Sequence, residues 1–190
     1  MEENPYPTLV VARPGSSSAE SASSRYLLVG AGKHGANSQV VGYDRKTVRL
    51  RGTLIYRDNQ TMVELVNGSI SVLSGVSQAQ QMTKELGTFV LTGEIVDSKC
   101  YFGVMNPGNG KVHRDCAVRC LSGGAPPVLV TSDLTGSPAV LLLTDPVLNP
   151  LRKEAFLNRV AQPVRIRGNV VKKGETWFLE TEPTAVSPRQ

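Results

Sequence analysis

The stretch Thr88-Phe-Val-Leu-Thr-Gly-Glu-Ile-Val-Asp97 decides the fold. It is rich in β-branched and apolar residues, so it predicts a strong strand, and it runs almost directly into the first cysteine of the chain, Cys100. No equivalent strand precedes the first half of the chain, although the later segments of the two halves match in order. We therefore expect this stretch to be the opening strand of a barrel in the second half.

Outward from this strand, both halves contain the same series of short apolar segments. Pro7-Thr-Leu-Val10 parallels Pro127-Val-Leu-Val130, and Thr47-Val-Arg-Leu-Arg-Gly52 parallels Pro163-Val-Arg-Ile-Arg-Gly168. Alternating apolar and basic residues are typical of half-buried strands. The repeat predicts a mainly β protein of two tandem oligonucleotide/oligosaccharide-binding (OB)-like barrel modules, with a short helix over Pro150–Val160 in the second.

The predicted boundaries follow from this repeat. Residues 1–68 form a first β module that lacks its opening strand, 69–87 form a linker, and 88–184 form the second module with the cysteines. Either Ser69–Leu73 fills the vacant edge of the first module, or the natural protein extends further toward its N-terminus. Val76–Leu86 is a candidate short helix between the modules.

Composition limits the classes of function. The chain has 190 residues, a net charge of +5 and 40% apolar residues, with no apolar run of membrane length. Basic residues are dispersed, so they give no strong signal for nucleic acid. Met1-Glu-Glu-Asn-Pro5 is not a signal peptide, which predicts a cytoplasmic location if the chain is complete and an extracytoplasmic one if an N-terminal segment is missing.

The chemistry is concentrated in residues 97–120, which contain all three cysteines and one of the two histidines. His113, Cys116 and Cys120 have the spacing that places side chains along one face of a helix, at about 100° per residue. Cys100 completes a set of three thiols and one imidazole, which suits zinc or an iron–sulfur cluster. Asp97 and Asp115 flank the set and are candidates to orient the imidazole.

Two other interpretations of the cysteines stay open. Cys100 pairs with Cys116 or Cys120 in a disulfide, or the thiols are buried small apolar groups. A thiol–disulfide redox protein using Cys116 and Cys120 is the main alternative function, and a disulfide-stapled interaction module is a third. No nucleophile–base pair or carboxylate pair has a spacing that indicates an enzyme.

The turn Gly30-Ala-Gly-Lys-His-Gly35 follows a predicted strand but has neither nucleotide-binding pattern. A tight connection that needs glycine is the simpler interpretation. His34 in this turn is a candidate to lie at the interface between the modules and to reach the cysteine site.

The run Thr92-Gly-Glu-Ile-Val-Asp-Ser-Lys-Cys100, followed by His113, Cys116, Cys120 and Gly123-Gly124, resembles a family of small bacterial domains of unassigned role. Those domains are typically exported, look like small β-barrels, and carry Gly-x-Ile-x-Asp-Ser-x-Cys, then His, then Cys-x-x-x-Cys. The resemblance covers roughly residues 88–181 and includes Ser98. It implies a site at these residues without naming its chemistry.

Together these features predict a metal-binding β-barrel protein, with structural zinc or an iron–sulfur cluster. Such a protein is expected to be an accessory or redox subunit of a larger bacterial assembly. Its expected partner is another protein or a membrane-associated complex, and the chain itself has no expected transmembrane segment.

Overall fold

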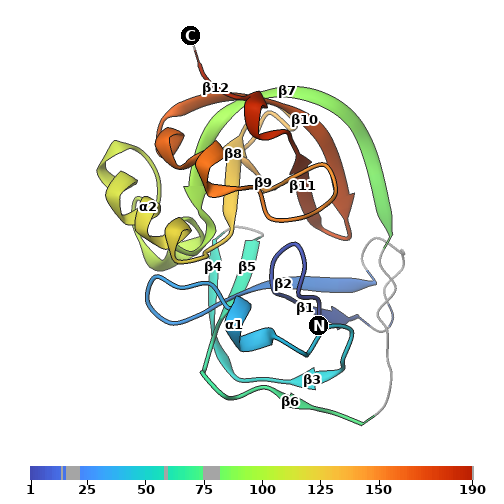
Figure 1. Ribbon diagram of the computed structural model, residues 1–190. Coiled ribbons are helices and arrows are strands. Elements are labelled where there is room, and N and C mark those ends of the chain that lie inside the picture. The colour runs from blue at the N-terminus through green and yellow to red at the C-terminus, as the bar shows by residue number, and fades with distance from the viewer. Residues whose placement is uncertain (14, 16–21, 58–59, 75–81, 190) are drawn as a thin grey trace.

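The computed structural model describes residues 1–13, 15, 22–57, 60–74 and 82–189, and it is mainly β (Figure 1). The second half forms a closed barrel of five strands. Neighbouring strands of the ring are antiparallel except β9 and β11, which run parallel, and the pairing of β10 with β11 closes the ring. The five are β7 (Thr83–Asp97), β8 (Pro127–Thr131), β9 (Ala139–Thr144), β10 (Pro163–Lys173) and β11 (Thr176–Glu180).

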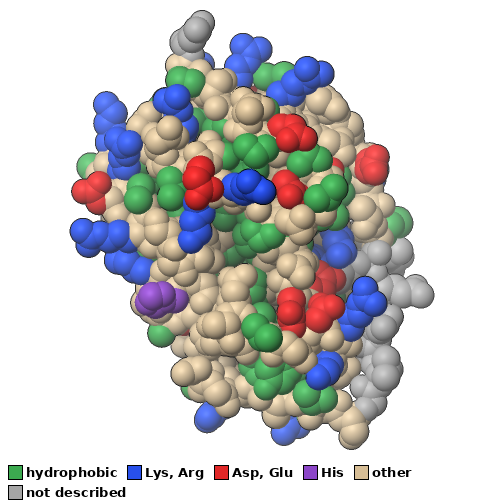
Figure 2. Space-filling model, viewed as in Figure 1, with side chains coloured by type: hydrophobic (Ala, Val, Ile, Leu, Met, Phe, Trp, Pro, Cys, Tyr) green, Lys and Arg blue, Asp and Glu red, His purple; other side chains and the backbone are tan. Residues whose placement is uncertain are grey.

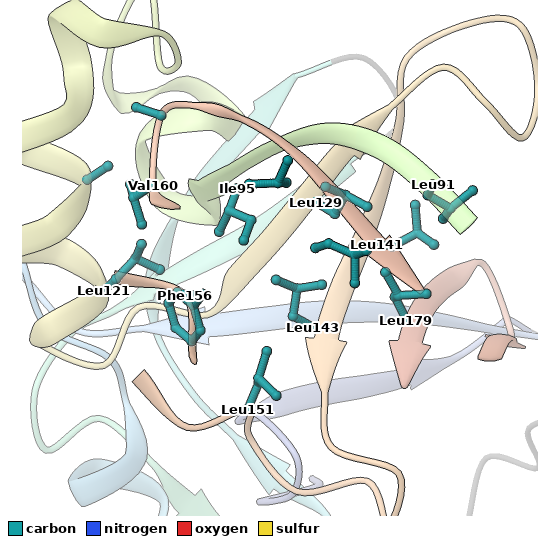
Figure 3. Packing of buried hydrophobic residues seen from close by; sticks show 14 of the residues in the cluster. Leu91, Ile95, Leu121, Leu129, Leu141, Leu143, Leu151, Phe156, Val160 and Leu179 are labelled. Carbon is teal, nitrogen blue, oxygen red and sulfur yellow. The ribbon is translucent and has the colours of Figure 1, made fainter. Parts of the chain in front are cut away.

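Side-chain alternation explains why the barrel strands form. In β10, Val164, Ile166 and Val170 point inward, while Arg165 and Arg167 are exposed between them. The buried residues of the strands form the main core, whose packing is shown in Figure 3. Leu121 and Phe156, which come from the connections, lie close together at one end of that core. A short strand, β12 (Val186–Pro188), pairs antiparallel with the first residues of β10.

The first half forms an open sheet of four strands in the order β1-β2-β5-β4. Strands β2 and β5 are parallel and the outer pairs are antiparallel, so the sheet repeats the pairing of β8, β9, β11 and β10. No counterpart of β7 closes it among the described residues. The strands are β1 (Thr8–Ala12), β2 (Ser23–Val29), β4 (Gly52–Arg57) and β5 (Gln60–Leu65), and a single-turn helix, α1 (Asn37–Val40), follows β2.

Ser69–Leu73 does not fill the vacant edge of this sheet. Its strand β6 (Ser71–Val72) instead pairs with β3 (Val48–Arg49) in a separate two-stranded ribbon. Both residues of β6 are exposed, so this strand adds nothing to the packed face of the four-stranded sheet.

Two connections also differ from expectation. Strand β7 begins at Thr83, inside the predicted linker, and residues 75–81 of that linker, with most of the predicted helix, lie outside the described residues. In place of a helix over 150–160 there are two 3₁₀ turns, Lys153–Ala155 and Leu157–Arg159. Phe156 between them is buried in the barrel core, and its φ of −136° lies outside the helical region, so the two turns do not join into one helix.

A second apolar cluster joins the two halves. Leu27, Ile55 and Met62 of the open sheet pack against Val128 and Phe178 of the barrel. The Tyr6 hydroxyl donates a hydrogen bond of 2.5 Å across this boundary to the backbone oxygen of Leu143. One outer face of the barrel is therefore covered by the first half of the chain itself.

The surface shows no concentrated basic stripe on the face seen in Figure 2, where Lys and Arg side chains are scattered among acidic and apolar ones. This distribution agrees with the dispersed charge of the sequence. None of the helices in the described part of the chain is long and apolar enough to span a membrane.

Candidate metal centre

The cysteines lie in the long connection between β7 and β8. This connection contains a π-helical turn (Cys100–Val104), a 3₁₀ turn (Lys111–His113) and the helix α2 (Arg114–Ser122). Asp115 lies in the first turn of α2, where a negative charge stabilises the helix dipole. Gly124, with φ of +97°, ends the helix in the left-handed conformation that glycine favours.

The three thiols meet at the end of β7. The sulfur of Cys100 lies 3.9 Å from that of Cys116 and 3.9 Å from that of Cys120. All three sulfur atoms are within 4.8 Å of one another, and none forms a disulfide. Cys100 and Cys120 are buried, while Cys116 is partly exposed. Thiols gathered in this way are able to hold a metal ion.

Hydrogen bonding makes the two buried thiols unequal. The hydrogen bond between Cys100 and Cys120 lowers the pKa of Cys120, and this effect outweighs the opposing effect of burial. The same bond, together with burial and the negative charge of Asp97, raises the pKa of Cys100. Cys120 is therefore the more acidic of the two.

Asp97 connects the imidazole to the cysteine loop. Its Oδ1 accepts a hydrogen bond of 2.8 Å from the backbone N–H of Cys100, and its Oδ2 lies 3.0 Å from Nε2 of His113. Both Asp97 and His113 are buried. The sequence proposed two carboxylates for this role, but Asp115 is exposed. Ser98 is fully buried, and its hydroxyl has no hydrogen-bond partner among the described residues.

The predicted set of four potential ligands does not gather at one point. The three cysteines form one group, and His113 forms a second with Asp97 and Cys100, so Cys100 belongs to both. The reason is local: His113 belongs to the 3₁₀ turn before α2, so it does not continue the helical face that carries Cys116 and Cys120.

The structure adds a lysine that sequence analysis missed. Nζ of Lys33, in the glycine-rich turn of the first half, lies 2.8 Å from Sγ of Cys116 and 4.0 Å from Sγ of Cys120. The hydrogen bond to Cys116 raises the pKa of Lys33. Lys33 is 83 residues away from Cys116, so no local sequence pattern could have paired them.

A second lysine makes the reverse contact, because it belongs to the cysteine loop and binds the glycine-rich turn. Lys99, directly before Cys100, is buried and donates hydrogen bonds to the carbonyl oxygens of Gly30 (2.8 Å) and Gly32 (2.6 Å). Its Nζ also forms an ion pair of 2.5 Å with Glu64 of β5. The only sequence signal for this role is its place within Asp-Ser-Lys-Cys.

Close backbone contact explains the glycines at both sides of this junction. The N–H of Gly35 donates a hydrogen bond of 2.9 Å to the carbonyl oxygen of Gly123. A Cβ atom at Gly123 would lie 1.9 Å from the carbonyl oxygen of Lys33, and one at Gly35 would lie 2.1 Å from that of Gly124. Side chains at these positions would separate the turn from the end of α2.

His34 lies at the boundary between the halves but not at the thiols. Its side chain is exposed, and it lines a pocket of about 690 Å³ together with Tyr6, Asn67, Leu121 and Phe156. His34 belongs to neither of the two groups of potential metal ligands among the described residues.

Comparisons of this chain with protein-family models, curated proteins and solved structures find no match.

Proposed function

We propose that the protein binds one metal ion, zinc, through Cys100, Cys116 and Cys120. The observation that supports this is the spacing of the sulfur atoms, 3.9 Å from Cys100 to each of the other two. Zinc–sulfur bonds of about 2.3 Å in tetrahedral geometry place two sulfur ligands about 3.8 Å apart. The thiols need little movement to become ligands of a single ion.

The same spacing favours zinc over a four-iron cluster. In such a cluster each cysteine binds a different iron atom, so the ligand sulfurs lie around the outside of the cluster. Here all three sulfurs lie within 4.8 Å of one another, which suits one shared metal atom. The buried Asp97–His113 pair beside Cys100 supplies the outer hydrogen bonding that metal sites commonly have.

We further propose that the metal stabilises a junction on which a partner depends. The ligands belong to the barrel half, and Lys33 and Lys99 connect them to the turn of the first half. Metal binding would therefore hold the two halves together. The resemblance to exported bacterial domains supports an extracytoplasmic accessory subunit of a larger assembly, with a protein or membrane-associated complex as the partner.

The strand pairing supports two tandem OB-like modules as the finer description of the fold. Followed around the ring from β7, the strand order is β7-β8-β9-β11-β10, and β10 then pairs with β7. This is the order of a five-strand OB barrel. The open sheet has the last four strands in the same order, which supports an incomplete copy of the same module.

A thiol–disulfide redox protein is the second candidate function. Cys100 is 3.9 Å from both other sulfurs, so either bond could form after a movement of about 2 Å, given a disulfide length of about 2.05 Å. The ammonium group of Lys33 beside Cys116 stabilises a thiolate, which is the nucleophile in disulfide exchange.

Elemental analysis and thiol titration of anaerobically purified protein separate these functions. One equivalent of zinc that is lost in Cys116→Ser protein supports the metal site. Iron with sulfide would instead indicate a cluster. Metal-free protein with a single titratable thiol would contradict the metal site and leave the disulfide as the working model.

A further inference from the structure

We propose that the metal at the three cysteines keeps one coordination position open toward Lys33, and that a small thiolate binds there. This inference rests on the metal site proposed above. It adds an external ligand of stated chemistry, a low-molecular-weight thiol, and it gives Lys33 the role of holding that ligand.

The donor set supplies the first argument. Among the described residues, no fourth His, Cys, Asp or Glu side chain groups with all three cysteines, and His113 groups with Asp97 and Cys100 alone. Zinc is almost always four-coordinate in structural sites, and sites with three protein ligands leave the fourth position to water or an external ligand. Three sulfurs with no protein partner for the fourth position indicate a site of the second kind.

Exposure and position supply the second argument. Cys116 is the partly exposed thiol, and Lys33 approaches the edge between Cys116 and Cys120 at 2.8 and 4.0 Å. The Lys33 side chain is exposed, so it can move aside without losing buried contacts. Asp97 and His113 are buried beside Cys100, and a ligand therefore enters from the Lys33 side.

Charge supplies the third argument. Zinc with three thiolates carries a net charge of −1, and a bound thiolate makes it −2. Lys33 is the cation placed to balance this charge, because Lys99 is already paired with Glu64 and two carbonyl oxygens. A thiol is favoured over harder ligands because a soft thiolate matches a sulfur-rich centre. On binding, the thiol releases its proton to the buffer and its sulfur replaces water.

The test uses the full chain loaded with Co²⁺, whose absorption reports the number of thiolate ligands. Titration with 2-mercaptoethanol should raise the thiolate-to-cobalt absorption from the level of three thiolates to that of four. Lys33→Met should weaken this binding about fivefold, the effect of losing one partly screened ion pair. Added salt should reduce the difference. Lys46→Met, which removes an exposed lysine with no contact to the thiols, should have no effect.

Each outcome has a separate meaning. Protein that takes up no Co²⁺, or shows no thiolate absorption, contradicts the metal site itself. Protein with three thiolate ligands whose spectrum is unchanged by 2-mercaptoethanol overturns only the open position. If His113 holds the fourth position, the thiol will bind to His113→Ala protein and not to the wild type, which also overturns the inference. Equal affinity of the wild type and the Lys33→Met protein for 2-mercaptoethanol would contradict the role of the lysine in holding the ligand.

Discussion

Replacing Lys99 with Met tests whether the buried lysine holds the two halves together. Its side chain is only 3% exposed, and Nζ meets three acceptors: the carbonyl oxygens of Gly30 and Gly32, and the carboxylate of Glu64. Met has a similar length and is apolar, so the change removes the charge and all three interactions while keeping most of the packing.

The structure allows the size of the effect to be estimated. Hydrogen bonds of a charged group contribute about 1.5–3 kcal/mol each, and two carbonyl oxygens lose such a bond. The side chain of Glu64 is 33% exposed, so water can solvate it again and the lost ion pair adds no more than about 1 kcal/mol. Because water also reaches carbonyls of a loosened turn, we expect a total loss of about 3 kcal/mol.

Urea unfolding followed by fluorescence of Trp177, the only tryptophan, measures this loss. The apolar cluster that joins the halves supports a single cooperative transition, so one free energy of unfolding can be assigned. Lys46→Met is the control and should change stability by less than about 0.5 kcal/mol. A loss below about 1 kcal/mol in Lys99→Met protein would refute the reasoning. So would a Lys99→Met change that costs almost nothing in a Glu64→Gln background, because most of the loss is assigned to the two carbonyl oxygens and not to the ion pair.

Three further changes test other parts of the structure. Gly123→Ala places a methyl group 1.9 Å from the carbonyl oxygen of Lys33, so we expect thermal unfolding to show a loss of about 2 kcal/mol. Asp97→Asn removes the charge of the carboxylate that accepts the Cys100 N–H hydrogen bond, so this zinc ligand is held less firmly and chelator competition should show zinc affinity lower by about 10- to 100-fold. Burial would raise the pKa of Glu2, but the hydrogen bond and charge of Arg25 outweigh it and lower the pKa. The stability that this carboxylate contributes is therefore present above its unfolded pKa of 4.5 and is lost as pH falls through the folded pKa. Free energies of unfolding measured from pH 6 to 3 should decline more steeply in wild type than in Glu2→Gln protein.

The barrel strands were predictable where periodicity was strong. The alternation in β10 and the apolar run before Cys100 identify strands without any tertiary information. The start of β7 was not predictable, because Thr83, Lys84 and Glu85 are exposed and carry no apolar period. They are strand residues because they pair with the end of β10, past an irregularity in register, and that pairing exists only in the folded chain.

The candidate site divides in the same way. Asp97 and the three cysteines are near one another in sequence, so their proximity could be predicted from a strand and one helix. The contacts of Lys33 with Cys116 and of Lys99 with Gly30 join residues 83 and 69 positions apart. The glycine-rich turn indicated tight geometry, and only the packed structure shows that the tightness serves contact with the end of α2.

The first residues of the chain reach across to the last strands of the barrel, which bears on how the protein is made. Tyr6 bonds to the backbone of Leu143, and Glu2 pairs with Lys173 at the end of β10. A ribosome produces the first half before those partners exist. The apolar face of the open sheet therefore stays exposed until the barrel strands that cover it have been made. Contacts this distant in sequence slow folding. The N-terminal half should therefore need protection from aggregation during synthesis. Its contacts with the barrel can form only after the final barrel strands have left the ribosome.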